Sequence, residues 1–187
     1  PAKPEPAATS PMQPYTYAPL TPLDSAATID LAEQSLPTIE QQVRAIIATE
    51  QPITADLLAK RVAKLWGIAR SHRLQALIDK ALAAVAPHQE PNGKEGVTYW
   101  LNADNAKEYT TFRSDSDRDI DEVPLVEIGN AMRFVIDLNI AMDKEELKRR
   151  AAQQLGYARK GTTIDKYTDI ALSKLLQQGY VTLSDCN

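Results

Sequence analysis

Cysteine and histidine are scarce in this chain of 187 residues, and both shortages limit its chemistry. Cys186 has no second cysteine to pair with, which excludes a disulfide framework and a cysteine metal site within the chain. His72 and His88 have no partner at metal-ligand spacing, and a lone histidine is usually solvent-facing or structural. A free cysteine fits a reducing compartment, so we expect a cytoplasmic protein.

Long apolar runs and catalytic motifs are also missing. No stretch approaches the roughly 18 residues of a membrane span, and no signal peptide is visible. A glycine-rich phosphate loop and a nucleophile motif are absent, and the acidic run from Asp115 to Glu122 lacks the glycine and terminal glutamate of an EF-hand loop. We therefore expect no membrane contact, no cofactor, no small-molecule substrate and no enzymatic activity. Because the chain starts at Pro1, we interpret it as a fragment of a longer protein.

The chain does not carry a large charge of either sign. The formal net charge is −4, and it is unevenly distributed. Residues 36–101 carry 8 basic and 6 acidic side chains and residues 124–187 carry 9 and 8, whereas residues 102–123 carry 3 and 7. Nucleic-acid-binding domains are usually more basic than this. The balance permits weak nucleic-acid binding without implying it.

What the chain does contain is an internal repeat with an offset of 89 residues. The segment LAKRVAKLWGIAR, from Leu58 to Arg70, aligns without a gap with LKRRAAQQLGYAR, from Leu147 to Arg159. Six of the thirteen pairs are identical, and the apolar pattern continues to match on both sides. A similarity of this extent predicts two copies of one three-helix unit.

Capping signals predict the first two helices of the first copy. Thr38, followed three residues later by Gln41, is typical of a helix start. Thr54 then caps a second helix expected over residues 55–66, and Gly67 provides the left-handed residue that ends many helices.

The third helix of the first copy is expected over residues 71–85, directly after a short turn. Asn92 and Gly93 lie between two β-prone runs, 88–90 and 97–101, and this pattern predicts a β-hairpin. Helix, short turn and helix form a helix-turn-helix. Three helices followed by a hairpin predict a winged helix.

The second copy repeats this plan with small departures. Pro124 lies where its first helix should begin. Asp143 is expected to cap the second helix and Gly156 to end it. The third helix is expected over residues 164–178, and a strand over residues 180–183 would be the remainder of a wing.

The fold class predicted is therefore mainly α (α+β), with two tandem winged-helix units. Residues 36–101 form the first unit and 124–187 the second, with an acidic connector at 102–123 and a proline-rich linker or tail at 1–35. The tail could instead lie in a groove of the folded part as an extended strap, held by its larger side chains: Tyr15, Tyr17, Leu20 and Leu23.

Basic, amide and hydroxyl side chains occupy the positions of each helix-turn-helix that face DNA in known motifs. The second helix of the motif reaches base edges with its N-terminal residues, while the wing and the preceding turn contact phosphates. In the first copy these positions hold Arg70, Ser71, His72, Arg73 and Gln75, with Asn92 and Lys94 on the wing. In the second copy they hold Arg159, Lys160, Thr162, Thr163 and Lys166. These twelve residues are the candidate contacts for double-stranded DNA.

A structural interpretation of the same arginines stays open. Arg70 and Arg159 follow helix C-termini, where a cation is stabilised by about 0.3 to 1 kcal/mol through the helix dipole. Arg61 and Arg150 lie in mid-helix, where they could pair with acidic neighbours. Winged helices that contact only protein are also common, so docking to a protein partner or to other domains of the parent chain is the alternative to DNA.

Four segments resemble a bacterial domain family whose activity is uncharacterised. They are PITADLLAKRVAKLWGIAR at 52–70, YTTFR at 109–113, DIDEVPLVEIGNAMRFVI at 119–136 and ELKRRAAQQLGYAR at 146–159. The resemblance covers residues 36–183. Members lie at the C-terminal end of very large helicase-like proteins that carry an AAA-type ATPase core and often a nuclease resembling very-short-patch-repair endonuclease. The resemblance implies an accessory role beside a helicase or nuclease, and it supplies no catalytic residue.

Overall fold

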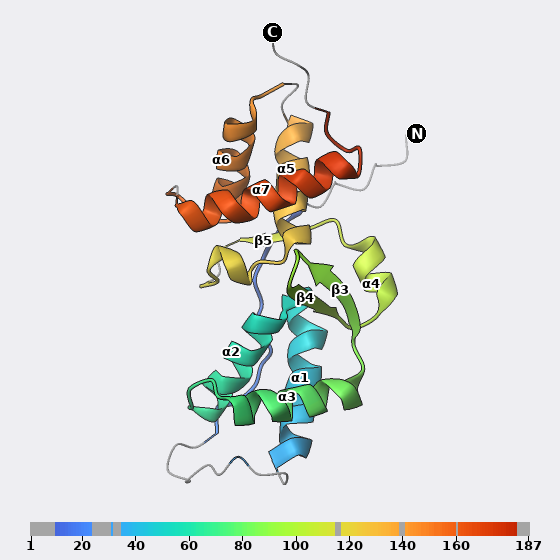
Figure 1. Ribbon diagram of the computed structural model, residues 1–187, viewed down its shortest axis with the longest axis vertical. Coiled ribbons are helices and arrows are strands. Elements are labelled where there is room, and N and C mark those ends of the chain that lie inside the picture. Colours follow the sequence, from blue (N-terminus) through green and yellow to red (C-terminus); the bar gives the residue numbers. More distant parts are fainter. Residues whose placement is uncertain are drawn as a thin grey trace, which may run out of the picture. The chain divides into compact units, whose positions relative to one another are not determined.

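The computed structural model describes residues 10–23, 31, 35–114, 117–138, 141–159 and 161–182. Within these residues the protein is mainly helical, of the α+β class, with seven α-helices and two small sheets (Figure 1). The chain divides into two compact units. The first unit comprises residues 16–109 and 118–125, and the second comprises residues 1–15, 110–117 and 126–187. None of the helices among the described residues is long and apolar enough to cross a membrane.

The first unit contains three main helices and one sheet. Its helices are α1 (Leu36–Glu50), α2 (Ala55–Trp66) and α3 (His72–Val85), and α3 lies across α1 (Figure 1). Its antiparallel sheet has the strand order β2-β4-β3, from β2 (Ile53–Thr54), β3 (His88–Asn92) and β4 (Gly96–Trp100). A short helix, α4 (Ala103–Glu108), follows.

Capping explains most helix boundaries in this unit. The side chain of Thr54 accepts a hydrogen bond from the Leu57 amide, and Gly67 ends α2 with a φ of 62°, so both predicted boundaries are confirmed. The predicted start at Thr38 is wrong, because α1 already begins at Leu36. Pro37 lies in the first turn of α1, where the amide hydrogen that proline lacks has no partner within the helix.

The predicted hairpin is confirmed, and its strands pair further than expected. β3 and β4 pair up to Asn92 opposite Gly96, around a turn at residues 93–95. A Cβ atom on Gly96 would lie 2.5 Å from the carbonyl oxygen of Asn92, so only glycine fits there. Gly93 has a φ of 80°, which glycine adopts without strain. The turn therefore depends on two glycines as well as on Asn92.

The second unit contains three helices and a short parallel sheet. The helices are α5 (Leu125–Leu138), α6 (Lys144–Gln154) and α7 (Thr162–Gln177), and β1 (Met12–Pro14) pairs in parallel with β5 (Phe112–Ser114). α5 begins directly after Pro124, as expected. A 3-10 turn, η2 (Ile120–Glu122), precedes α5 in the chain and belongs to the first unit.

The same cap geometry recurs in both units. Asp143 accepts a hydrogen bond from the Glu146 amide at the start of α6, as Thr54 does for α2. Gly156, with a φ of 97°, follows the end of α6 at the position equivalent to Gly67. The Tyr157 amide then donates to the Ala152 carbonyl, as the Ile68 amide donates to Ala63. The sequence repeat is therefore also a repeat of local structure.

The end of the second unit differs from the prediction. Tyr180 to Thr182 form no strand, and the last residue of the predicted strand, Leu183, lies outside the described residues. Gly179 has a φ of 70° and turns the chain back, so that the Tyr180 amide donates to the Leu175 carbonyl. The Tyr180 ring then receives the Arg133 guanidinium at 4.4 Å. α7 also begins at Thr162, two residues earlier than predicted.

Segments expected to be linkers contain β1, α4 and β5. Residues 16–23 follow the first unit in an extended path: the Ala18 amide donates to the buried Glu50 carboxylate at 2.9 Å, and the Leu23 amide donates to Leu65. Residues 10–15 belong to the second unit, where Pro11 accepts a hydrogen bond from Phe112. The extended strap is thus the arrangement of residues 10–23.

Candidate nucleic-acid interface

In the first unit, four of the candidate residues surround one shallow depression at the turn between α2 and α3. Its volume is about 350 Å³ and it is lined by Ala59, Arg70, Ser71, His72, Leu74, Gln75 and Ile78. Ser71 caps α3 by accepting a hydrogen bond from the Leu74 amide. Arg70, His72 and Arg73 are exposed around the beginning of α3. This end of α3 is accessible, as a helix that enters a DNA groove must be.

Two carboxylates moderate the positive charge of this surface. Arg70 donates to Asp56 at 2.9 Å, and the two side chains are 51% and 78% exposed. An exposed pair of this kind contributes only about 0 to 1 kcal/mol, so a phosphate can compete for Arg70. Gln75 donates to Asp79 one helical turn later. The surface is therefore only weakly basic.

The two wing candidates do not line the depression. The side-chain oxygen of Asn92 accepts a hydrogen bond from the Leu125 amide at 2.8 Å. This hydrogen bond lies within the first unit and gives Asn92 a structural role that the sequence analysis did not anticipate. Lys94 is exposed in the hairpin turn.

In the second unit, the candidates lie at the turn between α6 and α7. Arg159 is exposed, and among the described residues no carboxylate forms an ion pair with it. Thr162 and Thr163 are exposed in the first turn of α7, and Lys166 lies 5.7 Å from the ring of Tyr167. Lys160 lies outside the described residues.

Arg159 also lines a depression, with a volume of about 180 Å³. The repeat relates this depression to the one in the first unit, because Lys148, Arg159 and Ile164 stand where the first copy has Ala59, Arg70 and Leu74. The helix position that lines this depression is therefore apolar in the first unit, at Ala59, and charged in the second, at Lys148.

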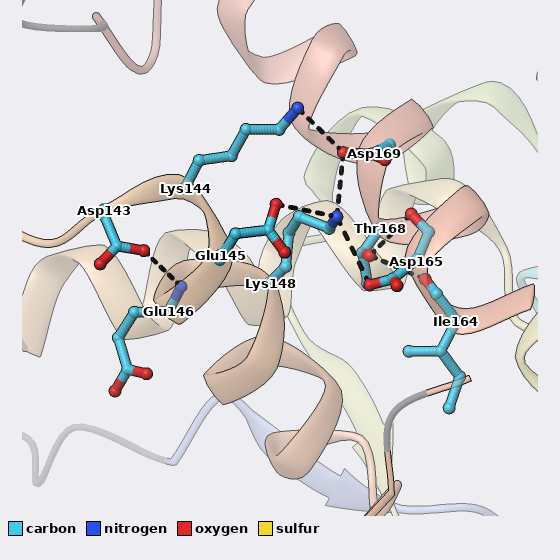
Figure 2. A network of polar contacts seen from close by, with 9 residues as sticks. All are labelled: Asp143, Lys144, Glu145, Glu146, Lys148, Ile164, Asp165, Thr168 and Asp169. Atoms are coloured by element: carbon cyan, nitrogen blue, oxygen red, sulfur yellow. Dashed lines mark hydrogen bonds and ion pairs between the residues drawn. The ribbon is translucent and has the colours of Figure 1, made fainter. Parts of the chain in front are cut away.

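Lys148 forms ion pairs with three carboxylates beside this depression. Its side chain is 6% exposed, and its ammonium group lies 3.4 Å from Glu145, 3.4 Å from Asp165 and 3.2 Å from Asp169 (Figure 2). Burial alone lowers the pKa of Lys148, but the hydrogen bond and charge of Asp169, together with Glu145 and Asp165, outweigh it and raise the pKa above 10.5. The ion pairs connect α6 to α7 with the lysine charged.

The carboxylate of Asp169 also contacts Lys144, at 3.1 Å. The hydrogen bond from Lys144 lowers the pKa of Asp169, and the contact with Lys148 acts in the same direction. Thr168 is buried beside the network and donates to the carbonyl of Ile164 at 2.7 Å. Among the residues that the structure describes, no group of histidine, cysteine or acidic side chains is arranged to hold a metal ion.

The mid-helix arginines have internal partners, as the structural interpretation expected. Arg61 forms an ion pair with the fully buried Glu50 at 2.8 Å. Arg149 and Arg150 both donate to Glu146, and the hydrogen bond from Arg149, followed by that from Arg150, lowers the pKa of Glu146 to about 2. Arg61 is therefore part of a buried ion pair, whereas the pairs of Arg149 and Arg150 with Glu146 are partly exposed.

Two residues that shape the candidate surfaces were missed by the sequence analysis. Asp56 pairs with Arg70, and Lys148 forms ion pairs with Glu145 and Asp165, which lie beside Arg159. The repeat alignment contained a signal for both. It places Lys148 opposite Ala59, a change from apolar to charged at an inward-facing helix position, and it places Asp56 opposite Glu145.

The architecture defines a mainly helical α+β protein of two compact units, each with three main helices among the described residues. Residues 30–73 match the model of a family described as protein of unknown function (DUF3320). The matched segment includes α1, β2, α2 and the first two residues of α3. No curated protein and no solved structure matches the chain.

Proposed function

We propose that this chain is a non-catalytic tandem winged-helix module that binds double-stranded DNA weakly through backbone contacts. The order of elements in the first unit, α1-β2-α2-α3-β3-β4, supports this proposal, because three helices and a hairpin make up a winged helix. The three helices of the second unit follow the same order, and α6 has the same type of N-terminal side-chain cap as α2. The second unit is a winged helix without a complete wing.

The observation that carries the proposal is the exposed turn before α3. Arg70, Ser71 and His72 surround an open depression there, on the helix that enters the major groove in helix-turn-helix proteins. Arg159 and the hydroxyls of Thr162 and Thr163 occupy the equivalent turn of the second unit. Arginine and hydroxyl side chains are common donors to phosphate oxygens.

Weak, sequence-independent binding fits the charges of these surfaces. Asp56 and Asp79 lie among the cations of the first unit, and the chain as a whole has a formal charge of −4. Few phosphates would be neutralised, so affinity would be low and would fall with salt. The module would therefore need a larger protein to hold it on DNA.

We place the module in a helicase- or nuclease-type parent protein in the cytoplasm. The resemblance of residues 36–183 to domains from such parents supports this assignment, and residues 30–73 match a family of unknown function. In that setting the module would hold duplex DNA beside the catalytic domains without cofactor or substrate of its own.

Salt-dependent binding to duplex DNA tests the proposal. We expect the full chain to bind a fluorescently labelled duplex of about 20 base pairs, two helical turns, in anisotropy titrations. Affinity should fall between about 50 and 200 mM salt, with a log–log slope that Arg70→Ala and Arg159→Ala together reduce by at least about 1. Lys174→Ala, which removes an exposed cation near the end of α7, is the matched control. Absence of binding at the lowest salt would refute the proposal.

A docking module for protein is the second candidate. One observation favours it: the outward side of α3 carries exposed Ala76, Ala83 and Ala84, which offer DNA no hydrogen bonds. These small side chains would allow another protein surface to approach closely. The titration above separates the candidates, because a docking module would not bind duplex DNA at any salt concentration.

A further inference from the structure

The two helix-turn-helix surfaces carry the same arginine in different electrostatic surroundings. Arg70 and Arg159 are equivalent in the repeat, and both are exposed. Asp56 pairs with Arg70 at 2.9 Å. Its counterpart in the second unit, Glu145, instead pairs with Lys148 at 3.4 Å.

The difference has a structural cause at a single pair of positions. Where α6 has Lys148, α2 has Ala59. The Lys148 ammonium forms ion pairs with Glu145 and Asp165 (Figure 2). Both of these carboxylates line the same depression as Arg159. Ala59 offers no charge, so Asp56 is left to pair with the surface arginine.

We infer that Lys148 is a positioning residue that keeps Arg159 available for a DNA phosphate, so that the second unit makes the stronger backbone contact. The inference rests on the proposed DNA binding and adds which copy dominates. Glu145 and Asp165 have side chains 60% and 49% exposed. Without Lys148 they are free to turn towards Arg159 and neutralise it, as Asp56 does to Arg70.

A double-mutant cycle on the full chain tests this role. We expect Arg159→Ala to weaken duplex binding about threefold and to lower the salt slope by about 1, the contribution of one phosphate contact. Lys148→Ala should produce a similar loss. The double variant should bind no worse than Arg159→Ala, because Lys148 acts only through Arg159. Losses that multiply in the double variant would overturn the inference.

Controls separate this role from net charge and from folding. Lys174→Ala removes the same charge from α7 and should leave binding and slope nearly unchanged. Far-UV circular dichroism shows whether Lys148→Ala still folds. A purely structural Lys148 would change the melting curve without changing the slope of the folded protein, and that result would also contradict the inference.

The first unit supplies a test that does not depend on Lys148. Arg70→Ala should have little effect in the wild-type chain, and Asp56→Asn should increase affinity about threefold by releasing one cation. In the Asp56→Asn background, Arg70→Ala should then cancel the gain. Asp104→Asn, an exposed acid of α4, is the charge-matched control. An equal gain from both asparagine variants would contradict the inference.

The outcomes also separate this inference from the proposed function. If the wild-type chain shows no salt-dependent binding to the duplex, the proposed function fails. If the wild type binds but Arg159→Ala has no effect, or less effect than Arg70→Ala, the inference alone fails and the DNA contact stands.

Discussion

Among the described residues, each unit contains an arginine paired with a fully buried glutamate, with a tyrosine of the strap beside the arginine. In the first unit, Arg61 pairs with Glu50 and lies 4.8 Å from the ring of Tyr17. In the second, Arg113 pairs with Glu127 at 2.6 Å and lies 4.7 Å from the ring of Tyr15. Both glutamates are fully buried. Such pairs stabilise a fold only while both partners are present.

Removal of the buried carboxylate should therefore destabilise the first unit strongly. We expect Glu50→Ala to lower the free energy of unfolding by about 3 to 5 kcal/mol, since it leaves the buried Arg61 without its partner and the Ala18 amide without an acceptor. Urea titrations followed by tryptophan fluorescence report on this unit, because Trp66 and Trp100 both belong to it.

An exposed glutamate of the same unit provides the control. Glu108→Ala, in α4, should change the free energy of unfolding by less than about 0.5 kcal/mol. If Glu50→Ala were as mild as this control, the buried pair would not be the stabilising contact that its geometry indicates.

The pH dependence of the second unit should depend on Glu146. Arg149 and Arg150 lower its pKa to about 2, from an ordinary value of 4.5. Since the folded pKa is below the unfolded one, the stabilisation is present above pH 4.5 and is lost as the pH falls towards 2. Glu146→Gln should therefore flatten the loss of stability in this window.

Circular dichroism of urea unfolding, at several pH values, measures this effect over the whole chain. Tryptophan fluorescence reports only the first unit and should show no change between Glu146→Gln and the wild type. A Glu146→Gln variant whose stability falls with acid as steeply as the wild type would contradict the assignment.

At the scale of elements, the strap residues 10–23 are part of the fold. β1 gives β5 its only strand partner among the described residues, and Tyr15 is 9% exposed while Tyr17 is 42% exposed. The cation–π contact of a desolvated pair is worth about 2 kcal/mol, against about 0.5 to 1 kcal/mol at an exposed site. The two tyrosines should therefore contribute unequally.

We expect Tyr15→Ala to destabilise the second unit by about 3 kcal/mol, from lost burial and the lost contact with Arg113. Tyr17→Ala should destabilise the first unit by only about 1 kcal/mol. Circular dichroism and tryptophan fluorescence together assign each loss to its unit. Equal losses from the two variants would show that burial of Tyr15 has no energetic consequence.

Local signals predicted the helices well and the linker segments poorly, for a physical reason. The boundaries of α2 follow from Thr54 and Gly67, which act on neighbouring residues of the chain. β1 and β5 depend on contacts between residues about 100 positions apart, such as Met12 with Phe112. These short strands have no periodic pattern of their own. They lie within a proline-rich segment and an acidic segment, and their sequences therefore did not predict strands.

The candidate surface was only partly predictable from the sequence, for the same reason. Residue types and the repeat indicated Arg70 and Arg159, but the partner of each arginine depends on side chains from another turn of the fold. Asp56 is 14 residues from Arg70, and Asp165 reaches Lys148 from the next helix. The hydrogen bond from the Leu125 amide to the Asn92 side chain likewise joins residues 33 positions apart.

At the scale of the whole molecule, the two units share a sequence repeat and a helix order but differ in the charge of one surface position. The cap geometry of α2 recurs in α6. The adjacent depression, by contrast, is lined by Ala59 in the first unit and by Lys148 in the second. Under the proposed function, this difference in charge would let the second unit contact DNA more strongly than the first. The strap supplies one tyrosine to each unit and is common to both.

The location of DNA on the chain is the most direct test of the account. We would record amide spectra of the ¹⁵N-labelled full chain while adding a duplex of about 20 base pairs at low salt. The account predicts shifts confined to the two turns, around Arg70 to Arg73 and Arg159 to Lys166, with the larger shifts in the second unit. Shifts centred elsewhere, for example on α4, or no shifts at all, would contradict it.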